Sequence, residues 1–380
     1  MKIILSRLEL TTLLNKIQTI TPSKPAFAIL GTLLIEAVDD QVVISATDGT
    51  VSMRVYLSAT VQKEGSIALP ARQFISLVRE LTAPTLEIHT PSPETAAINS
   101  GSSRFKIQGM LKAEFPEFPN LQEGVHFSIP SKELKELLSR SLFSAAKVDT
   151  QNTLNALFLE HSSIEASLCS TDGKRLTKIR FNASFPVGAS GSYLIPLKAA
   201  EEIIHTLDAK EEGAVVITLM QDKIAFELNN VTLVSKLFSG KFPDVSRIIP
   251  QSKEQALSLH REELMSLLRQ INLFTSEQHN SVKFSFTTGE LHISINTATS
   301  GEGTVSMPVN YAGEPLHIAF NPVYFLDILR HSKDETVRFG LTDAHNPGLI
   351  TDSTSALFVI MPMRLNEGHA PRKETAAAAT

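Results

Sequence analysis

An internal repeat constrains this chain more than any other feature of its sequence. The segment Ala46–Gly49 (Ala-Thr-Asp-Gly) returns as Ser170–Gly173 (Ser-Thr-Asp-Gly), and the two aspartates are 172 − 48 = 124 residues apart. Asp-Gly is a common turn signal, but its return at the length of a domain is a reason to look for further copies. The spacing therefore predicts a duplicated folding unit.

Other landmarks recur at similar offsets. The proline-led segment Pro70–Leu81 is matched by Pro196–Leu207, 196 − 70 = 126 residues later, and by Asn321–Leu329, 321 − 70 = 251 residues later. The apolar pattern of Leu8–Ile17 returns near Leu134 and again at 264–271, with the three- and four-residue spacing of an amphipathic helix. Three divergent copies of one unit therefore fill the chain.

Composition sets broad limits on function. The chain has 380 residues, of which 42% are hydrophobic and 20% charged, which suits a globular protein with a core in each copy. Its net charge of −5 gives no global attraction to nucleic acid, so DNA binding would need a local cationic surface. Met1–Glu9 is too short in its apolar run for a signal peptide, and no run is long enough to span a membrane, so we expect a cytoplasmic protein.

The single cysteine argues against a disulfide framework or a thiolate zinc site. Cys169 lies in an apolar, alternating run and is expected to be a buried core thiol. We expect no metal and no cofactor.

Each copy reads as helix, strands, helix, strands. In the first copy, the strands are expected at 33–38, 42–46, 52–57, 85–88, 95–99 and 104–108, with helices at 8–17 and after Pro70. A helix with one apolar stripe must lie on another layer, which predicts an α+β fold with two helices packed on antiparallel sheets in each copy. The expected domains are 1–121, 126–249 and 254–365, with linkers at 118–131 and 249–257 and a disordered tail at 366–380.

Three such copies in line can form an arc whose ends associate head to tail. Two chains would then supply twelve helices, and at about 10 Å per helix these would line a bore of roughly 28 Å. A nucleic-acid duplex would pass through such a ring.

The sequence resembles the bacterial DNA polymerase III beta subunit, the sliding clamp, along residues 1–365. The motifs that carry the resemblance are Thr171–Leu176, Gly240–Asp244 and Val359–Leu365, in this order and at these separations. The resemblance implies a homodimeric ring that a clamp loader places around duplex DNA. It also implies that this ring tethers DNA polymerase III and repair proteins, without catalysis of its own.

The resemblance further implies a groove between the second and third copies that binds a short linear peptide. The matching residues are Leu154, Thr171, Gly173, Lys174, Arg175, Leu176, Pro243, Arg247, Ile248, Pro347, Val359, Met361, Pro362, Met363 and Arg364. Leucine, valine, proline and methionine suit an apolar trough, and arginines at its rim can pair with peptide oxygens. This sequence differs from the common family pattern at Thr153, Lys174 and His345, positions that bear on gating and peptide preference.

Two further sets follow from the resemblance. The candidates for sequence-independent DNA contact are Lys24, Arg72, Arg79, Lys147, Lys198, Arg269, Arg330 and Lys333. The candidates for the contact between two chains are Arg104, Phe105, Ile107, Leu273, Phe274 and Glu302. Because glutamates share the helices with the basic residues, the sequence leaves the sign of the bore potential open.

Two other classes of function compete with a clamp. An enzyme is disfavoured, since the chain has no Gly-x-Ser-x-Gly elbow, no phosphate-binding Gly-Lys-Ser/Thr loop and no His-Glu-x-x-His. A scaffold that binds only proteins would lack ring closure and a cationic bore, and these two properties separate it from a clamp.

Overall fold

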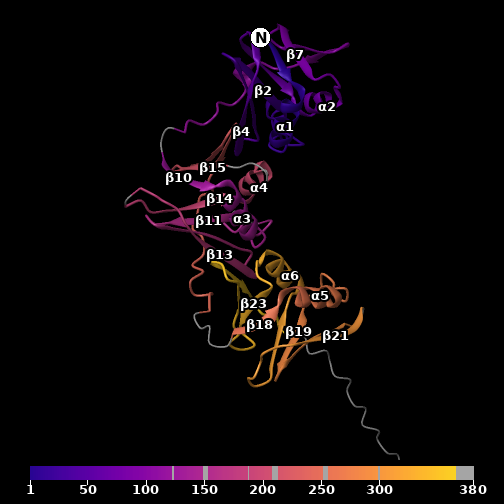
Figure 1. Cartoon of the computed structure of the whole chain (residues 1–380), viewed down its shortest axis with the longest axis vertical. Helices are drawn as coiled ribbons and strands as arrows, with labels where there is room; N and C mark the ends of the chain where they lie inside the picture. Colours follow the sequence, from indigo (N-terminus) through magenta and orange to yellow (C-terminus); the bar gives the residue numbers. More distant parts are fainter. Residues whose placement is uncertain are drawn as a thin grey trace, which may run out of the picture. The chain divides into compact units, whose positions relative to one another are not determined.

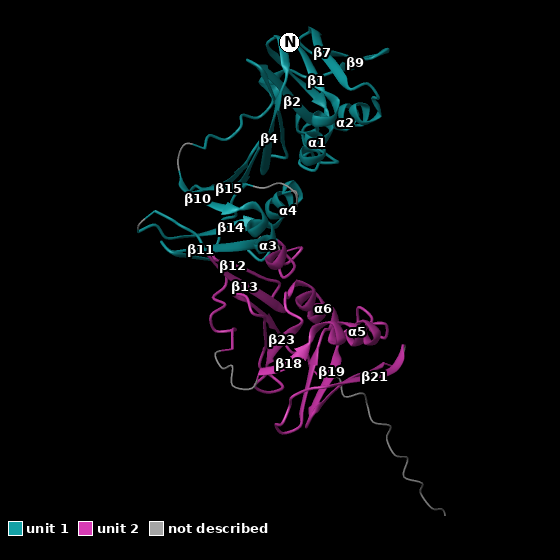
Figure 2. Ribbon diagram, viewed as in Figure 1, with its two compact units in different colours: residues 1–138, 150–166, 182–240 teal, residues 139–149, 167–181, 241–380 magenta. Residues whose placement is uncertain are grey.

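The computed structural model describes residues 1–121, 124–148, 153–186, 188–207, 213–250, 256–297 and 300–364 (Figure 1). The chain divides into two compact units (Figure 2). Unit 1 comprises Met1–Leu138, Thr150–Ala166 and Asn182–Gly240, and unit 2 comprises Ser139–Asp149, Ser167–Phe181 and Lys241–Thr380. The predicted tail at 366–380 lies outside the described residues.

The order of elements repeats three times, and we call these repeats module 1, module 2 and module 3. Each module runs strand, helix, three strands, a strand leading into the second helix, and three more strands. Module 1 lies in unit 1, module 3 lies in unit 2, and module 2 contributes to both units. The three predicted copies are thus present as three modules with the same element order.

In module 1, both helices bury one apolar stripe. Helix α1 (Arg7–Ile17) is capped by the Ser6 hydroxyl and buries four leucine and isoleucine side chains, and helix α2 (Ala71–Glu80) begins directly after Pro70. The strands are β1 (Lys2–Ser6), β2 (Thr32–Val38), β3 (Gln41–Thr47), β4 (Val51–Ser58), β5 (Thr60–Lys63), β6 (Gly65–Pro70), β7 (Thr85–Ser92), β8 (Thr95–Ser100) and β9 (Ser103–Gln108), with short 3-10 turns at Ala28–Gly31 and Lys112–Glu114.

Module 2 repeats this order without a counterpart of β5. Its helices are α3 (Ser131–Leu142) and α4 (Leu197–Thr206). Its strands are β10 (Val125–Pro130), β11 (Ala156–His161), β12 (Glu165–Thr171), β13 (Arg175–Asn182), β14 (Gly191–Pro196), β15 (Ala214–Leu219), β16 (Lys223–Leu228) and β17 (Val231–Lys236).

Module 3 repeats the order again. Its helices are α5 (Arg261–Asn272) and α6 (Pro322–His331), and α6 is capped by the Asn321 side chain, which accepts a hydrogen bond from the Val323 amide. Its strands are β18 (Ala256–His260), β19 (Val282–Thr287), β20 (Glu290–Thr297), β21 (Gly301–Pro308), β22 (Leu316–Phe320), β23 (Thr336–Gly340), β24 (Gly348–Thr351) and β25 (Ala356–Ile360).

Antiparallel pairing joins neighbouring modules into larger sheets. In unit 1, β17 of module 2 pairs with β4 of module 1 in the sheet β10-β15-β16-β17-β4-β3-β2-β6. In unit 2, β25 of module 3 pairs with β13 of module 2 in the run β12-β13-β25-β24-β23-β18. Two counterparts of these joint strands lie at sheet edges: β9 ends the sheet β5-β1-β7-β8-β9, and β21 ends the sheet β21-β20-β19-β22. The α+β class with helices on antiparallel sheets is confirmed.

The main difference from the sequence prediction concerns the linkers. The segment expected to link the first two copies, 118–131, contains strand β10, and the second expected linker, 249–257, runs into β18 at Ala256. Phe127 and Ile129 are buried because β10 pairs along its whole length with β15, a partner far away in the sequence. Proline and glycine near these strands mark their ends and do not exclude a strand between them.

Candidate functional site

The turn between β12 and β13 is the best-defined part of the predicted groove. The Asp172 carboxylate accepts hydrogen bonds from the Lys174 amide at 2.9 Å and the Arg175 amide at 3.0 Å. The Thr171 hydroxyl donates to the Arg175 carbonyl at 2.6 Å, and Gly173 takes a φ of 81°, which a glycine adopts without strain. The sequence motif therefore forms a tightly closed turn.

The same turn occurs in module 1, so its closure alone indicates no binding function. The Asp48 carboxylate accepts from the Thr50 and Val51 amides at 2.7 and 2.8 Å, and Gly49 has a φ of 91°. The two turns differ in the residue that follows: module 1 has buried Val51 where module 2 has Arg175.

Strand β25 and the segment after it bring the C-terminal motif to this turn. Val359 pairs with Leu176, and both side chains are buried. Beyond the strand, the Met361 amide donates to the Lys174 carbonyl at 2.9 Å, and the Met363 amide donates to the Ala319 carbonyl at 2.7 Å. Met361, Pro362 and Met363 are half-buried, and Arg364 is exposed. We call the apolar residues Met361, Pro362 and Met363 the ledge beside the turn.

Other predicted groove residues lie in two loops of unit 2. Pro243, Arg247 and Ile248 are exposed in the segment that follows β17, and Asp244 pairs weakly with Arg247 at 3.6 Å. Hydrogen bonds from the Ser246 side chain and amide hold the pKa of Asp244 below its usual value. Half-buried Pro347 directly precedes β24, which pairs with β25. Leu154 is half-buried and belongs to unit 1, whereas the other predicted groove residues belong to unit 2.

The side chain of Arg175 is held by two carboxylates and two aromatic rings. Its Nη1 donates to Asp327 at 2.6 Å and its Nε to Asp172 at 3.2 Å. Its guanidinium lies 4.6 Å from the ring centre of Tyr324 and 5.4 Å from that of Phe143. Sequence reasoning missed Asp327, Tyr324 and Phe143, because only the tertiary fold brings them to the turn.

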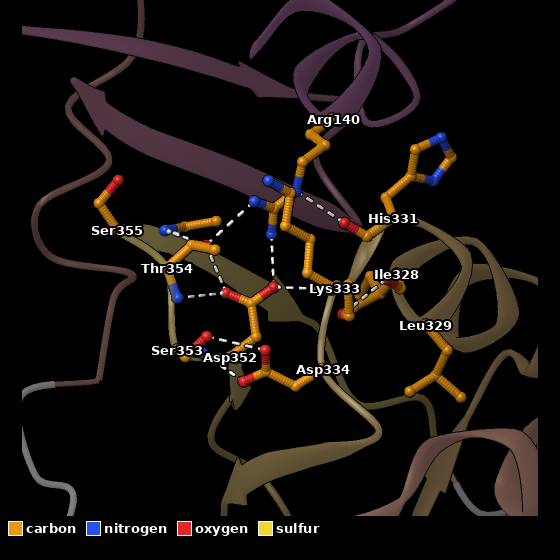
Figure 3. A network of polar contacts seen from close by, with 12 residues as sticks. Arg140, Ile328, Leu329, His331, Lys333, Asp334, Asp352, Ser353, Thr354 and Ser355 are labelled. Carbon is orange, nitrogen blue, oxygen red and sulfur yellow. Dashed lines mark hydrogen bonds and ion pairs between the residues drawn. The ribbon is translucent and has the colours of Figure 1, made fainter. Parts of the chain in front are cut away.

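A second buried charge, Arg140, fastens α3 to module 3 (Figure 3). Its Nη2 donates to Asp352 at 2.5 Å and its Nε to the His331 carbonyl at 2.8 Å, and both side chains of the ion pair are nearly or fully buried, at 7% and 0% exposure. Asp352 also accepts from the Lys333 amide at 3.0 Å. The network supports the strand pair β13–β25, which carries the predicted groove.

Three of the predicted DNA-contacting side chains make defined contacts within the protein. The Lys198 ammonium pairs with the Asp48 carboxylate, the Arg79 guanidinium donates to Asn15 and Gln18 at 2.6 Å each, and Arg330 donates to Asp327 at 3.0 Å. Burial would raise the pKa of Asp48, but hydrogen bonds from Lys198 and from the Val51 and Thr50 amides outweigh it, so the pKa lies below its usual value. The remaining candidates are all exposed: Lys24, Arg72, Lys147, Arg269 and Lys333.

The residues predicted to form the contact between chains lie on the edge strands β9 and β21 and directly after helix α5. Arg104, Phe105 and Ile107 lie on β9, where Phe105 is 41% exposed and Ile107 is buried. Glu302 lies on β21 and is exposed. Leu273, which follows α5, is 82% exposed, and neighbouring Phe274 is half-buried.

The described part of the chain contains neither a metal-binding cluster nor a membrane-spanning helix. No group of three His, Cys, Asp or Glu side chains there could hold a metal ion. None of the described helices is both long and apolar enough to span a membrane. Cys169 is a buried free thiol, as predicted.

Comparison with known proteins agrees with this repeated fold. Models of the N-terminal, central and C-terminal domains of the DNA polymerase III beta subunit match residues 1–120, 128–244 and 246–364. The beta sliding clamp of Chlamydia pneumoniae is 47% identical over 97% of this chain and 100% of its own length, and that of Escherichia coli K12 is 29% identical over 96% and 100%.

Solved structures show the same likeness. The Bacillus subtilis DNA polymerase sliding clamp has a TM-score of 0.91 at 26% identity and covers 96% of this chain and 99% of that one. The Bartonella birtlesii sliding clamp, solved bound to griselimycin, has a TM-score of 0.91 at 28% identity over 96% and 100%.

Three domains of one repeated α+β type define this chain as a DNA clamp. It belongs to the DNA polymerase III beta subunit family, the beta sliding clamps, which are non-catalytic processivity subunits in DNA replication.

Proposed function

We propose that two copies of this chain close head to tail into a ring that encircles duplex DNA. One observation carries the proposal: the two joints within the chain are built in the same way. At each joint, the last strand of one module pairs with the third strand after the first helix of the preceding module. The third joint of this kind would pair β9 of one copy with β21 of another, and each of these strands lies at the edge of its sheet. Exposed edge strands are templates for pairing between chains.

The repeat also predicts the register of this joint. In each module, a threonine hydroxyl donates a hydrogen bond to the carbonyl of the residue four positions later. The three acceptor residues therefore occupy the same position in the three modules. The three pairs are Thr47–Val51, Thr171–Arg175 and Thr297–Gly301.

The partners of these acceptor residues are equivalent as well. Val51 pairs with Ser235 in the first joint, and the hairpins β8–β9 and β16–β17 make Ile107 the counterpart of Ser235. Gly301 of one copy should therefore face Ile107 of the other.

This register brings complementary side chains together. Counting along the antiparallel strands from Gly301 and Ile107, Glu302 faces Lys106 and Gly303 faces Phe105. A Cβ at Gly303 would lie 3.4 Å from the Phe274 ring, so Phe105 would meet an apolar surface beside a glycine. An opposite-charge pair next to an aromatic contact suits a specific joint between strands.

Engineered disulfides test this register. Thr304 should face Arg104, so the double variant Thr304→Cys/Arg104→Cys should form covalent dimers under mild oxidation. Thr304→Cys/Lys106→Cys places its cysteines on a diagonal about 7–8 Å apart and should cross-link poorly. Dimers that cross-link only through the second pair would contradict the register, and monomers in solution at micromolar concentration would contradict the ring.

Enclosure of DNA is tested by topology. A ring should stay on a nicked circular duplex after loading and slide off once the circle is cut, because closure and not affinity retains it. Equal retention on circular and cut DNA would contradict the mechanism. The exposed lysines and arginines assigned to DNA would contribute weak, salt-dependent contacts with phosphates.

We further propose that the ledge at Met361–Met363 and the turn at Asp172–Arg175 form a groove for a linear peptide. The partners would be the clamp loader, the DNA polymerase III alpha subunit and other replication or repair proteins that carry such a peptide, all in the cytoplasm. A fluorescent peptide with glutamine, leucine and phenylalanine anchors tests this assignment by anisotropy.

A further inference from the structure

Arg175 is a buried cation that its turn does not require. Module 1 closes the same turn with Val51, a buried apolar residue. The side chain of Arg175 is only 11% exposed, and removing a guanidinium from water costs free energy that its partners must offset. A residue that is costly to bury and unnecessary for the local fold suggests a role outside the turn.

The guanidinium is fixed on two edges and one face. Asp172 accepts from Nε at 3.2 Å, and Asp327 accepts from Nη1 at 2.6 Å. The Tyr324 ring lies 4.6 Å from the guanidinium carbon. A planar cation held in this way has few orientations open to it.

The third nitrogen, Nη2, is left for another partner. The hydrogen bonds of Arg175 in the described part of the chain use Nε and Nη1, and Nη2 is not among the fully buried polar atoms that lack a partner there, so Nη2 keeps some exposed surface. The carbonyl of neighbouring Lys174 accepts from the Met361 amide at 2.9 Å. The open edge of Arg175 therefore belongs to a turn that directly adjoins the groove ledge.

The two carboxylates differ in what they fix. Asp172 belongs to the same turn as Arg175 and would move with it, whereas Asp327 comes from α6 of module 3. Its other oxygen accepts from Arg330 at 3.0 Å on the same helix. Of the two carboxylates, only Asp327 ties the arginine to the module that supplies Met361.

We propose that Asp327 is a positioning residue for the peptide groove: it holds Arg175 so that Nη2 meets a carbonyl or carboxylate oxygen of the bound peptide. The inference rests on the groove assignment made above. It adds a residue on α6 that contacts no peptide itself but determines how well the groove is prepared for one.

The test measures affinity for the fluorescent peptide by anisotropy with the full-length protein. Asp327→Asn should weaken binding about tenfold, because the freed guanidinium must be ordered anew for its charge-assisted hydrogen bond. Asp222→Asn is the matched control: it removes an equally charged aspartate from an exposed pair with Lys223 and should leave affinity unchanged. Thermal melting of each variant establishes that it is folded.

A double-mutant cycle separates positioning from general destabilisation. The Arg175→Lys variant keeps the positive charge but lacks Nη2. In this variant, the additional change Asp327→Asn should weaken peptide binding by a further factor of less than about two. Wild-type affinity in Asp327→Asn, or the same tenfold loss in both backgrounds, would overturn the inference and leave the groove intact. Absence of peptide binding by the unaltered chain would overturn the groove and the inference together.

Discussion

At each joint between modules, an ion pair links the turn to the second helix of the next module. At the joint in unit 1, the turn aspartate Asp48 pairs with Lys198 on the second helix of the next module. At the joint in unit 2, the turn carries its own cation, Arg175, and the second helix of the next module supplies the anion, Asp327. Lys198, expected to meet DNA, is therefore already engaged in an ion pair at a joint within the chain.

The buried pair of Arg140 and Asp352 should be essential for the stability of unit 2. Arg140→Ala would leave the Asp352 carboxylate buried without its cation, which costs about 3–5 kcal/mol. Chemical denaturation monitored by circular dichroism measures this loss. The exposed pair of Arg247 and Asp244 is the control, since Arg247→Ala should change stability by less than about 1 kcal/mol. Similar values for the two variants would contradict the role of burial.

Asp48 should make stability depend on pH. Its pKa is lowered in the folded state, so it contributes stability above the pKa of the unfolded chain and loses that contribution as pH falls through the folded pKa. Lys198→Ala should reduce stability at pH 7 by less than about 1 kcal/mol, because the lysine is partly exposed, and the difference should shrink as the pH falls below 3.8, the ordinary pKa of an aspartate. Denaturation curves of both proteins at pH 7 and in acid check the sign. A stability difference that grows in acid would contradict it.

At the scale of elements, the segment after β25 should be separable from the rest of module 3. Truncation after Ile360 removes the Met361 and Met363 amides, which bond to the Lys174 and Ala319 carbonyls, but none of the paired strands. Peptide binding should be lost in anisotropy, while gel filtration should still show a dimer. Undiminished peptide binding by the truncated chain would remove these methionines from the groove.

The elements show what the sequence could and could not reveal. The turn at Asp172 and the strand Ala356–Ile360 were predictable because turn signals and apolar runs are local and because the repeat supplied a second copy to compare. The contacts of Arg140 with Asp352 and of Arg175 with Asp327 join residues 212 and 152 positions apart, and no local pattern marks such partners. Strand β10 was missed for the same reason, since its pairing with β15 outweighs its proline and glycine neighbours.

At the scale of the whole molecule, the proposed ring would close through two equivalent joints between chains, which must hold and yet allow opening for loading. If Glu302 faces Lys106 across each joint, Glu302→Lys would place two cations opposite each other and weaken the dimer about tenfold. The double variant Glu302→Lys/Lys106→Glu restores opposite charges with reversed polarity and should regain most of the affinity. Analytical ultracentrifugation of the three proteins measures these constants. A double variant weaker than Glu302→Lys alone would show that the two residues do not meet, and the register inferred from the repeat would then be wrong.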